Sequence, residues 1–190
     1  MSGGHFHVHG PHDHQVEHAA QSGDRFAGRI AVMTAIFATL GALFGYLGGA
    51  TQNEALLYKN EAAIKKTEAS DQWNFYQAKS NKQNLAELGA SLANAEVADK
   101  FRKEAERYGT EKVAIMADAR ALEAASKEAE TKSDAAMHVH HRWAQAMMLI
   151  QIAISLAAIT LLTRNKGLHV VSYGVAAGAI VLGGLAALHI

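Results

Sequence analysis

The sequence gathers its most chemically versatile residue type, histidine, into two short clusters. Five of its 11 histidines fall in the opening segment "MSGGHFHVHGPHDH". Neutral imidazoles this close together bind Zn, Ni or Cu weakly, but the same composition also suits a plain polar segment with no metal role. Glycines and the single proline interrupt the segment, so we expect residues 1–29 to form a disordered tail. Its candidate metal ligands are His5, His7, His9, His12 and His14.

The second cluster lies far along the chain, in the segment "DAAMHVHHRW". Asp134, His138 and His141 are spaced i, i+4 and i+7, which places three potential metal ligands on one face of a helix. The alternative is a set of interfacial histidines beside lipid headgroups, with Arg142 and Trp143 as anchors. We favour the interfacial interpretation. We therefore predict no cofactor, with weak binding of divalent transition metals by the tail as the alternative.

No residue pattern in the chain is typical of an enzyme or of a nucleic-acid-binding protein. The sequence contains no nucleophile–base motif, glycine-rich phosphate loop or paired carboxylates in a recognisable context. Its 18 basic residues are balanced by 18 acidic ones, so there is no net attraction to nucleic acid. Cysteine is absent, which excludes disulfides and thiolate metal sites. We predict that the protein is not an enzyme.

Three stretches without Asp, Glu, Lys or Arg are long enough to cross a membrane. They cover residues 30–50, 143–163 and 168–190. About 20 apolar residues at ~1.5 Å each span a hydrocarbon core of about 30 Å. We expect three transmembrane helices, and the two histidine clusters then face opposite compartments. An ion or proton pathway normally needs a charged side chain within a span, which argues against a conventional transporter.

The charged middle of the chain, residues 51–142, has the composition of long helices and contains no proline. Its second half carries an apolar residue at every seventh position, which is typical of a coiled-coil seam. Since both arms must start and end at the same membrane face, we expect a helical hairpin with its tip near residues 89–96. The alternative is a loose, solvated segment. The register is Phe101, Tyr108, Ile115, Leu122, Ala129, Ala136 and Trp143.

The first arm of this hairpin offers two candidate apolar rows. One has a seven-residue step that Asp71 interrupts, and its members are Leu57, Ile64, Ala78, Leu85 and Leu92. A neighbouring row contains Ala62, Ala69 and Tyr76. Alanine-rich seams bury little apolar area, so one hairpin alone would be weakly held and we expect the chain to associate with itself. We predict that Trp73, Phe75 and Tyr76 take part in that association.

Glycines in two of the spans are candidates for close helix packing. Gly41, Gly45 and Gly49 recur every four residues in the first span, and Gly174 and Gly178 do so in the third. Small residues at this spacing let membrane helices approach closely. The alternative is chance, because glycine is common in membrane helices.

The segment "NEALLYKNEAAIKKTEASDQWNFYQAKSNKQ", residues 53–83, resembles the DUF4337 family of bacterial membrane proteins. The core of the resemblance is "KKTEASDQWNFYQAKS", residues 65–80. The order of a span, a long helical middle and two closely spaced spans also matches, while the histidine-rich tail does not. The family has no assigned function, so the resemblance implies an architecture and no site residues.

The sequence predicts an all-α protein with three transmembrane helices and a long, coiled-coil-like extramembrane hairpin. The predicted function is a membrane-anchored, homo-oligomeric scaffold or interaction protein with protein partners still to be identified. The alternative is a channel or transport-associated subunit, metal-linked through the tail. Arg25, Arg29, Arg164 and Lys166 flank the spans on one side. By the positive-inside rule we expect a bacterial inner-membrane protein with a cytoplasmic N-terminus and a periplasmic hairpin.

Overall fold

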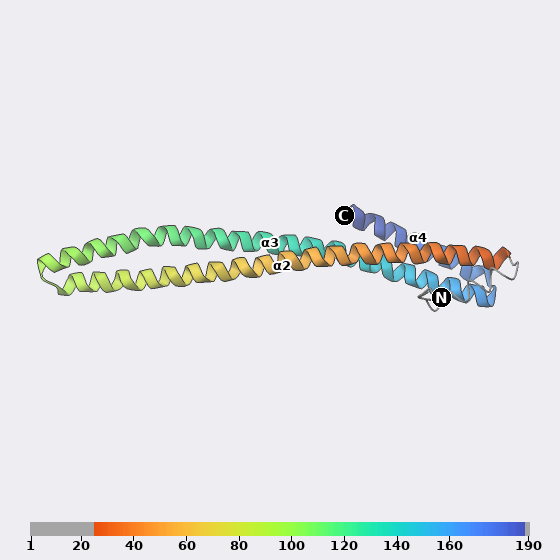
Figure 1. Ribbon diagram of the computed structural model, residues 1–190, viewed down its shortest axis with the longest axis horizontal. Helices are drawn as coiled ribbons and strands as arrows, with labels where there is room; N and C mark the ends of the chain where they lie inside the picture. Colours follow the sequence, from red (N-terminus) through yellow and green to blue (C-terminus); the bar gives the residue numbers. More distant parts are fainter. Residues whose placement is uncertain (1–24, 189–190) are drawn as a thin grey trace, which may run out of the picture. The chain divides into compact units, whose positions relative to one another are not determined.

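The computed structural model describes residues 25–188, which fold into three long helices and no strand (Figure 1). They are α2 (Arg25–Leu92), α3 (Ala95–Thr163) and α4 (Lys166–Ala187). The predicted all-α class is therefore confirmed for the described residues. Each helix contains a stretch long and apolar enough to cross a membrane, which indicates a membrane protein. The histidines of the tail, and the expected disorder of residues 1–24, lie outside the described residues.

Helix α2 begins earlier than the sequence suggested. Residues 25–29, expected in the disordered tail, form the first turns of α2. The reason is packing: Ala27 is buried, and Phe26 is half-buried against the apolar core and makes an edge contact with the His169 ring at 5.8 Å between centroids. Burial of these side chains stabilises helix before the uncharged stretch begins.

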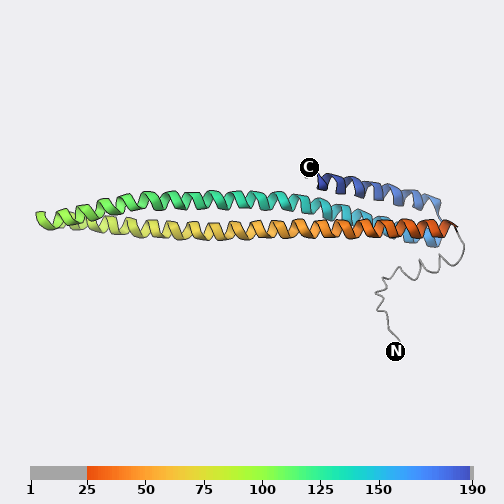
Figure 2. The same cartoon turned by 45° about the horizontal axis from the view of Figure 1, so that its top comes forward.

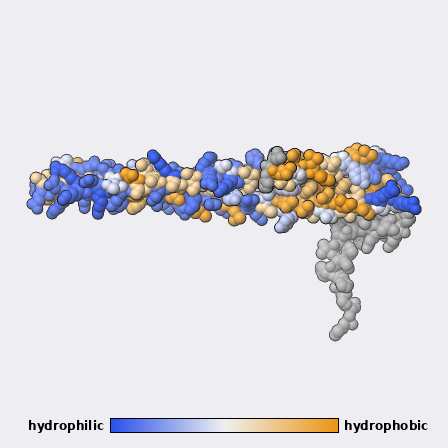
Figure 3. All heavy atoms as spheres, turned by 90° about the horizontal axis from the view of Figure 1, so that it is seen from above, coloured by the Kyte–Doolittle hydropathy of each residue, from blue (hydrophilic) through white to orange (hydrophobic). Residues whose placement is uncertain are grey.

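The helices form two compact units. The span unit contains the described residues up to Gln52 and from Met137 onward, and the arm unit contains Asn53–Ala136. α4 belongs to the span unit, where it lies beside α2 and α3 (Figure 2). Hydrophobic atoms gather over the span unit, whereas the surface of the arm unit is largely hydrophilic (Figure 3). This contrast is the one expected between a lipid-facing and a water-facing surface.

All three helices contribute to the core of the span unit. Phe37 and Phe44 come from α2, Trp143 and Ile150 from α3, and a row of alanines from α4. The buried Ser172 hydroxyl of α4 donates to the Ala153 carbonyl of α3 at 2.8 Å, so this polar group is satisfied. An interhelical hydrogen bond of this kind helps to hold helices together in an apolar solvent.

Only Arg164 and Asn165 separate α3 from α4. Arg164 has a φ of 52°, a left-handed conformation that is uncommon for a residue with a side chain. Asn165 caps α4: its side chain accepts from the Gly167 amide at 2.8 Å. These two residues reverse the chain between the apolar stretches of α3 and α4.

The turn between α2 and α3 is equally short. α2 ends at Leu92 and α3 begins at Ala95, inside the range 89–96 in which the tip was expected. Asn94 caps α3 by accepting from the Val97 amide at 3.2 Å, and Glu96 in the first turn complements the helix dipole. At Gly89 an added Cβ would lie 3.1 Å from the Phe101 ring. The two arms therefore approach closely beside the turn.

Candidate functional site

The seven-residue register of α3 faces α2 in the arm unit. Every register residue between 101 and 136 is buried or half-buried, whereas most of the charged residues between them are exposed. Small residues fill the alternate layers of the same seam. Counting both kinds of layer, the buried residues of the seam are Ala98, Ala105, Ile115, Ala119, Ala129 and Ser133.

On α2 the face that meets this seam is the alanine row and not the leucine row. Ala55, Ala62 and Ala69 are buried, with relative exposures of 0%, 7% and 2%. Tyr76 continues their seven-residue step and is half-buried. Small side chains allow the two backbones to approach closely, which the larger leucines would prevent.

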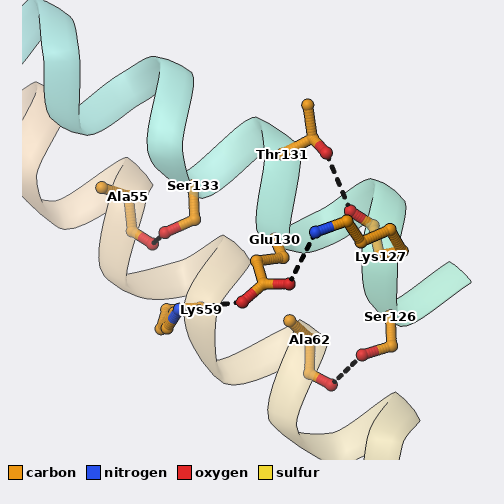
Figure 4. Close-up of polar contacts among 8 residues, drawn as sticks. All are labelled: Ala55, Lys59, Ala62, Ser126, Lys127, Glu130, Thr131 and Ser133. Atoms are coloured by element: carbon orange, nitrogen blue, oxygen red, sulfur yellow. Dashed lines mark hydrogen bonds and ion pairs between the residues drawn. The ribbon is translucent and has the colours of Figure 1, made fainter. Parts of the chain in front are cut away.

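Hydrogen bonds between the arms require this close approach. Ser126 donates to the Ala62 carbonyl at 2.8 Å, and Ser133 donates to the Ala55 carbonyl at 2.9 Å (Figure 4). Each bond joins a side chain of α3 to the backbone of α2, so each fixes the position of one helix along the axis of the other. Trp73 adds a third link, because its indole N–H donates to Glu123 at 2.8 Å.

Ion pairs line the edges of the same contact. Lys127 and Lys59 both approach Glu130, at 3.3 and 3.5 Å, and lower the pKa of its carboxyl group (Figure 4). A hydrogen bond from Lys79 lowers the pKa of Glu111 across the two arms. These pairs are partly exposed to water, so each contributes little to stability by itself.

The leucine row of α2 lies on the opposite side of that helix and is exposed to solvent. Leu57 is 69% exposed, Leu85 67% and Leu92 79%. We call this the outer row, and it consists of Leu57, Ile64, Asp71, Ala78, Leu85 and Leu92. Within the arm unit nothing packs against it. Of the two candidate rows of the first arm, the alanine row is therefore the one that packs against α3.

The three aromatic residues of α2 differ in environment. Trp73 and Tyr76 are half-buried and contact each other edge-on, with 5.6 Å between ring centroids. Lys112 of α3 lies 5.3 Å over the Tyr76 ring, so both aromatics are covered in part by the other arm. Phe75 points elsewhere, is 49% exposed, and has Lys79 over its ring. Their predicted role in association stays a prediction, and Phe75 is the best placed of the three.

The glycines of the span unit differ in how closely other helices approach them. A Cβ added at Gly41 would lie 3.2 Å from Ile150 of α3, and one added at Gly45 would lie 3.4 Å from Met147 of α3. At Gly49 and Gly174 it would meet nothing within 4 Å, and at Gly178 it would make an ordinary contact of 3.7 Å.

Two further glycines of the span unit lie in close contacts: Gly183, which continues the run of small residues after Gly174 and Gly178, and Gly48, which sequence reasoning missed. At Gly48 an added Cβ would lie 3.3 Å from Cβ of Trp143. At Gly183 it would lie 2.9 Å from the Phe44 ring. Counted from Gly41, Gly48 is at i+7 and lies within about 20° of the same helix face, whereas Gly49 is at i+8 and lies about 80° away. Gly48 is therefore the glycine that faces α3 together with Gly41.

The described histidines do not form a metal site. No group of three or more His, Cys, Asp or Glu side chains between residues 25 and 188 is arranged to hold a metal ion. His138 and His141 are exposed. His140, which was not a candidate, makes the one interhelical contact of this cluster, a 2.8 Å hydrogen bond between Nδ1 and the Gly48 carbonyl.

Over the described residues, this arrangement defines an all-helical protein with three stretches long and apolar enough to cross a membrane and a pair of helical arms rich in charged residues. The family model for DUF4337, described as a domain of unknown function, matches residues 26–189. The chain belongs to this family, as the resemblance of residues 53–83 indicated. No curated protein and no solved structure matches the chain.

Proposed function

We propose that the protein is a membrane-anchored, homo-oligomeric scaffold or interaction protein. In this proposal the two arms form a coiled-coil hairpin outside the bilayer, and the outer row of α2 joins one copy to the next. The observation that carries the proposal is that α2 has apolar rows on two opposite faces, of which the other arm covers only one.

The two rows have a fixed angular relation along the whole arm. Each outer residue lies two positions after an inner one, as Leu57 follows Ala55 and Ile64 follows Ala62. Two positions correspond to about 200° around a helix, so the rows lie on opposite sides. Because both repeat every seven residues, neither drifts toward the other. An exposed apolar row this regular is typical of an interaction surface.

The area of this surface is that of a stable interface. Six apolar residues on or beside the outer row are 49–79% exposed, namely Leu57, Ile64, Phe75, Leu85, Leu88 and Leu92. At roughly 200 Å² for a fully exposed residue of this size, they offer about 800 Å² per copy, which is the share that one partner contributes to a standard interface.

A second copy is the partner that fits best. Copies inserted with the same topology carry the outer row at the same distance along the chain from the first span, so their seven-residue steps match without adjustment. Asp71 interrupts the row once, near its middle. A single polar residue in an apolar seam sets register at a cost in stability.

The experiment compares the mass of the detergent-solubilised particle between two double variants. Leu57→Asn with Leu85→Asn changes the outer row, and Leu56→Asn with Val113→Asn is the control, since these residues are 51% and 62% exposed on other faces. We expect the first variant to dissociate and the control to keep the wild-type mass. Asp71→Leu should strengthen association. Monomeric wild-type protein, in detergent and after cross-linking in membranes, would refute the scaffold proposal. Equal dissociation of both double variants would refute only the role of the outer row.

We further propose that the protein resides in a bacterial inner membrane, with its N-terminus in the cytoplasm and its arms in the periplasm. Four basic residues support this orientation: Arg25 and Arg29 before the first span, and Arg164 and Lys166 between the last two. With three spans, the C-terminus then lies on the same side as the arms. A C-terminal phosphatase fusion should be active, and a C-terminal cytoplasmic fluorescent reporter should be dark. The reverse pattern would overturn the orientation.

A further inference from the structure

We propose that the groove between the first turns of α2 and α4 binds one anionic phospholipid. The groove has a volume of about 920 Å³ and belongs entirely to the span unit. It combines a cationic end with an apolar floor. Its lining includes Arg25, Arg29, Val32, Ile36, His169 and Tyr173.

At the cationic end, the described residues of the span unit place no acidic side chain. The described residues of this unit contain five Lys and Arg side chains and no Asp or Glu. Arg25 and Arg29 are one helical turn apart, and both are exposed. Guanidinium groups suit phosphate through paired hydrogen bonds. Both helices also begin at this end without an acidic residue in their first turns, which favours an anion there.

The apolar floor continues from the arginines along α2. Val32 and Ile36 are 63% and 55% exposed, and behind them Phe37 is buried and contacts Tyr173 edge-on, at 6.1 Å between ring centroids. From Arg25 to Phe37 the helix rises about 18 Å, slightly more than the ~15 Å half-thickness of a bilayer core. One acyl chain of a single leaflet therefore fits beside a headgroup held by the arginines.

The aromatic wall on α4 is held in place by stacked rings. His169 stacks on Tyr173 with 5.0 Å between centroids and a 20° interplanar angle, and Phe26 of α2 contacts the histidine ring edge-on. Opposite this wall, Gly28 leaves space: an added Cβ there would meet nothing within 4 Å. The groove is open at the point where a glycerol backbone would lie between phosphate and acyl chain.

The test measures lipid binding by the purified full chain in neutral detergent. Phosphatidylglycerol and phosphatidylcholine with identical acyl chains are titrated, with the melting temperature and native mass spectrometry as readouts. We expect one tightly retained phosphatidylglycerol and a higher melting temperature, with little effect of phosphatidylcholine. Arg25→Gln with Arg29→Gln should weaken phosphatidylglycerol binding about 30-fold, from the contribution of two basic side chains to attraction of an anionic lipid. Arg142→Gln, which removes one positive charge outside the groove, is the control.

A steric variant tests the groove without changing charge. Gly28→Leu fills the open space and should abolish retention, while Gly184→Leu, where an added Cβ also meets nothing within 4 Å, should not. Equal stabilisation by phosphatidylcholine, or unchanged binding by the arginine variant, would overturn the proposal. So would an equal effect of glycerol phosphate alone, which would show a site for a free anion. Binding seen only after deletion of residues 2–20 would mean that the tail occupies the groove, and would likewise overturn it.

Discussion

Replacing Gly183 by alanine should destabilise the span unit, although glycine to alanine normally stabilises a helix. The new methyl group would lie 2.9 Å from Cε1 and Cζ of Phe44 and 3.4 Å from Cζ3 of Trp143. Neither ring can move aside easily, because each is 6% exposed and the two pack together at 5.6 Å between centroids. Forcing a methylene-sized group into a packed core costs about 1–3 kcal/mol.

The adjacent Gly184 provides a matched control. An added Cβ at Gly184 meets nothing within 4 Å, so Gly184→Ala keeps only the helix-propensity gain of up to about 1 kcal/mol. Thermal unfolding in detergent separates the two, because 1 kcal/mol shifts the melting temperature of a chain of this length by about 2–4 °C. We expect Gly183→Ala to melt below wild type and Gly184→Ala at or slightly above it.

A double-mutant cycle identifies the source of the cost. Phe44→Leu removes the ring that Gly183→Ala would contact, so the cost of the alanine should shrink in that background. If Gly183→Ala melts at or above Gly184→Ala, the ring yields and the close approach at Gly183 is unimportant. If the cost is the same with Leu at position 44, it does not come from the contact with Phe44.

Two further predictions concern the arm unit. Gly109→Ala should stabilise it by up to about 1 kcal/mol, because α3 continues through this position and an added Cβ meets only Gln83, at 3.8 Å. Slower amide exchange across residues 53–136 would show this stabilisation, and faster exchange would contradict it. Lowering the pH should destabilise the arms, because Lys79 lowers the pKa of Glu111. The contribution of this pair to the free energy of unfolding is present above the ordinary carboxyl pKa of 4.5 and is lost as pH falls through the lowered pKa. Circular-dichroism melts between pH 6 and 3 should show a steeper loss for wild type than for Lys79→Gln, and equal slopes would refute the role of this pair.

The sequence was sufficient to predict the helices and the register of α3. The uncharged stretches and the absence of proline after residue 11 leave few alternatives to long helices. The step from Phe101 to Trp143 is regular, and no competing apolar row of similar quality exists on α3. Hydrophobic periodicity is most informative in this situation.

On α2 the same method found two candidate rows and could not decide which of them meets α3. The leucines of the outer row are more hydrophobic than Ala55, Ala62 and Ala69, so hydrophobicity alone favours them. Packing between the arms selects for small size instead, since Ser126 and Ser133 must reach the backbone of α2. A sequence with two apolar rows does not state which one faces its own chain and which faces a partner.

Contacts between helices distant in sequence were also beyond prediction. A four-residue repeat identified Gly41 and Gly45 but also Gly49, which faces no other helix. The tight contact at Gly183 depends on where Phe44 lies, and that position is set only when α2 and α4 pack. The groove between Arg25 and His169 likewise depends on this packing, and charge alone indicated only a membrane face.

The seven-residue repeat shared by both arms has a consequence for how this family can change in evolution. Inserting seven residues into each arm at matching heights would lengthen the helix pair by about 10 Å and leave every side chain on its present face. An insertion of three or five residues in one arm would turn the outer row toward solvent on a different side and break the serine–carbonyl pairs beyond it. We therefore expect DUF4337 proteins to differ in arm length by paired multiples of seven residues, with the turn around Gly89 and Phe101 carried outward unchanged.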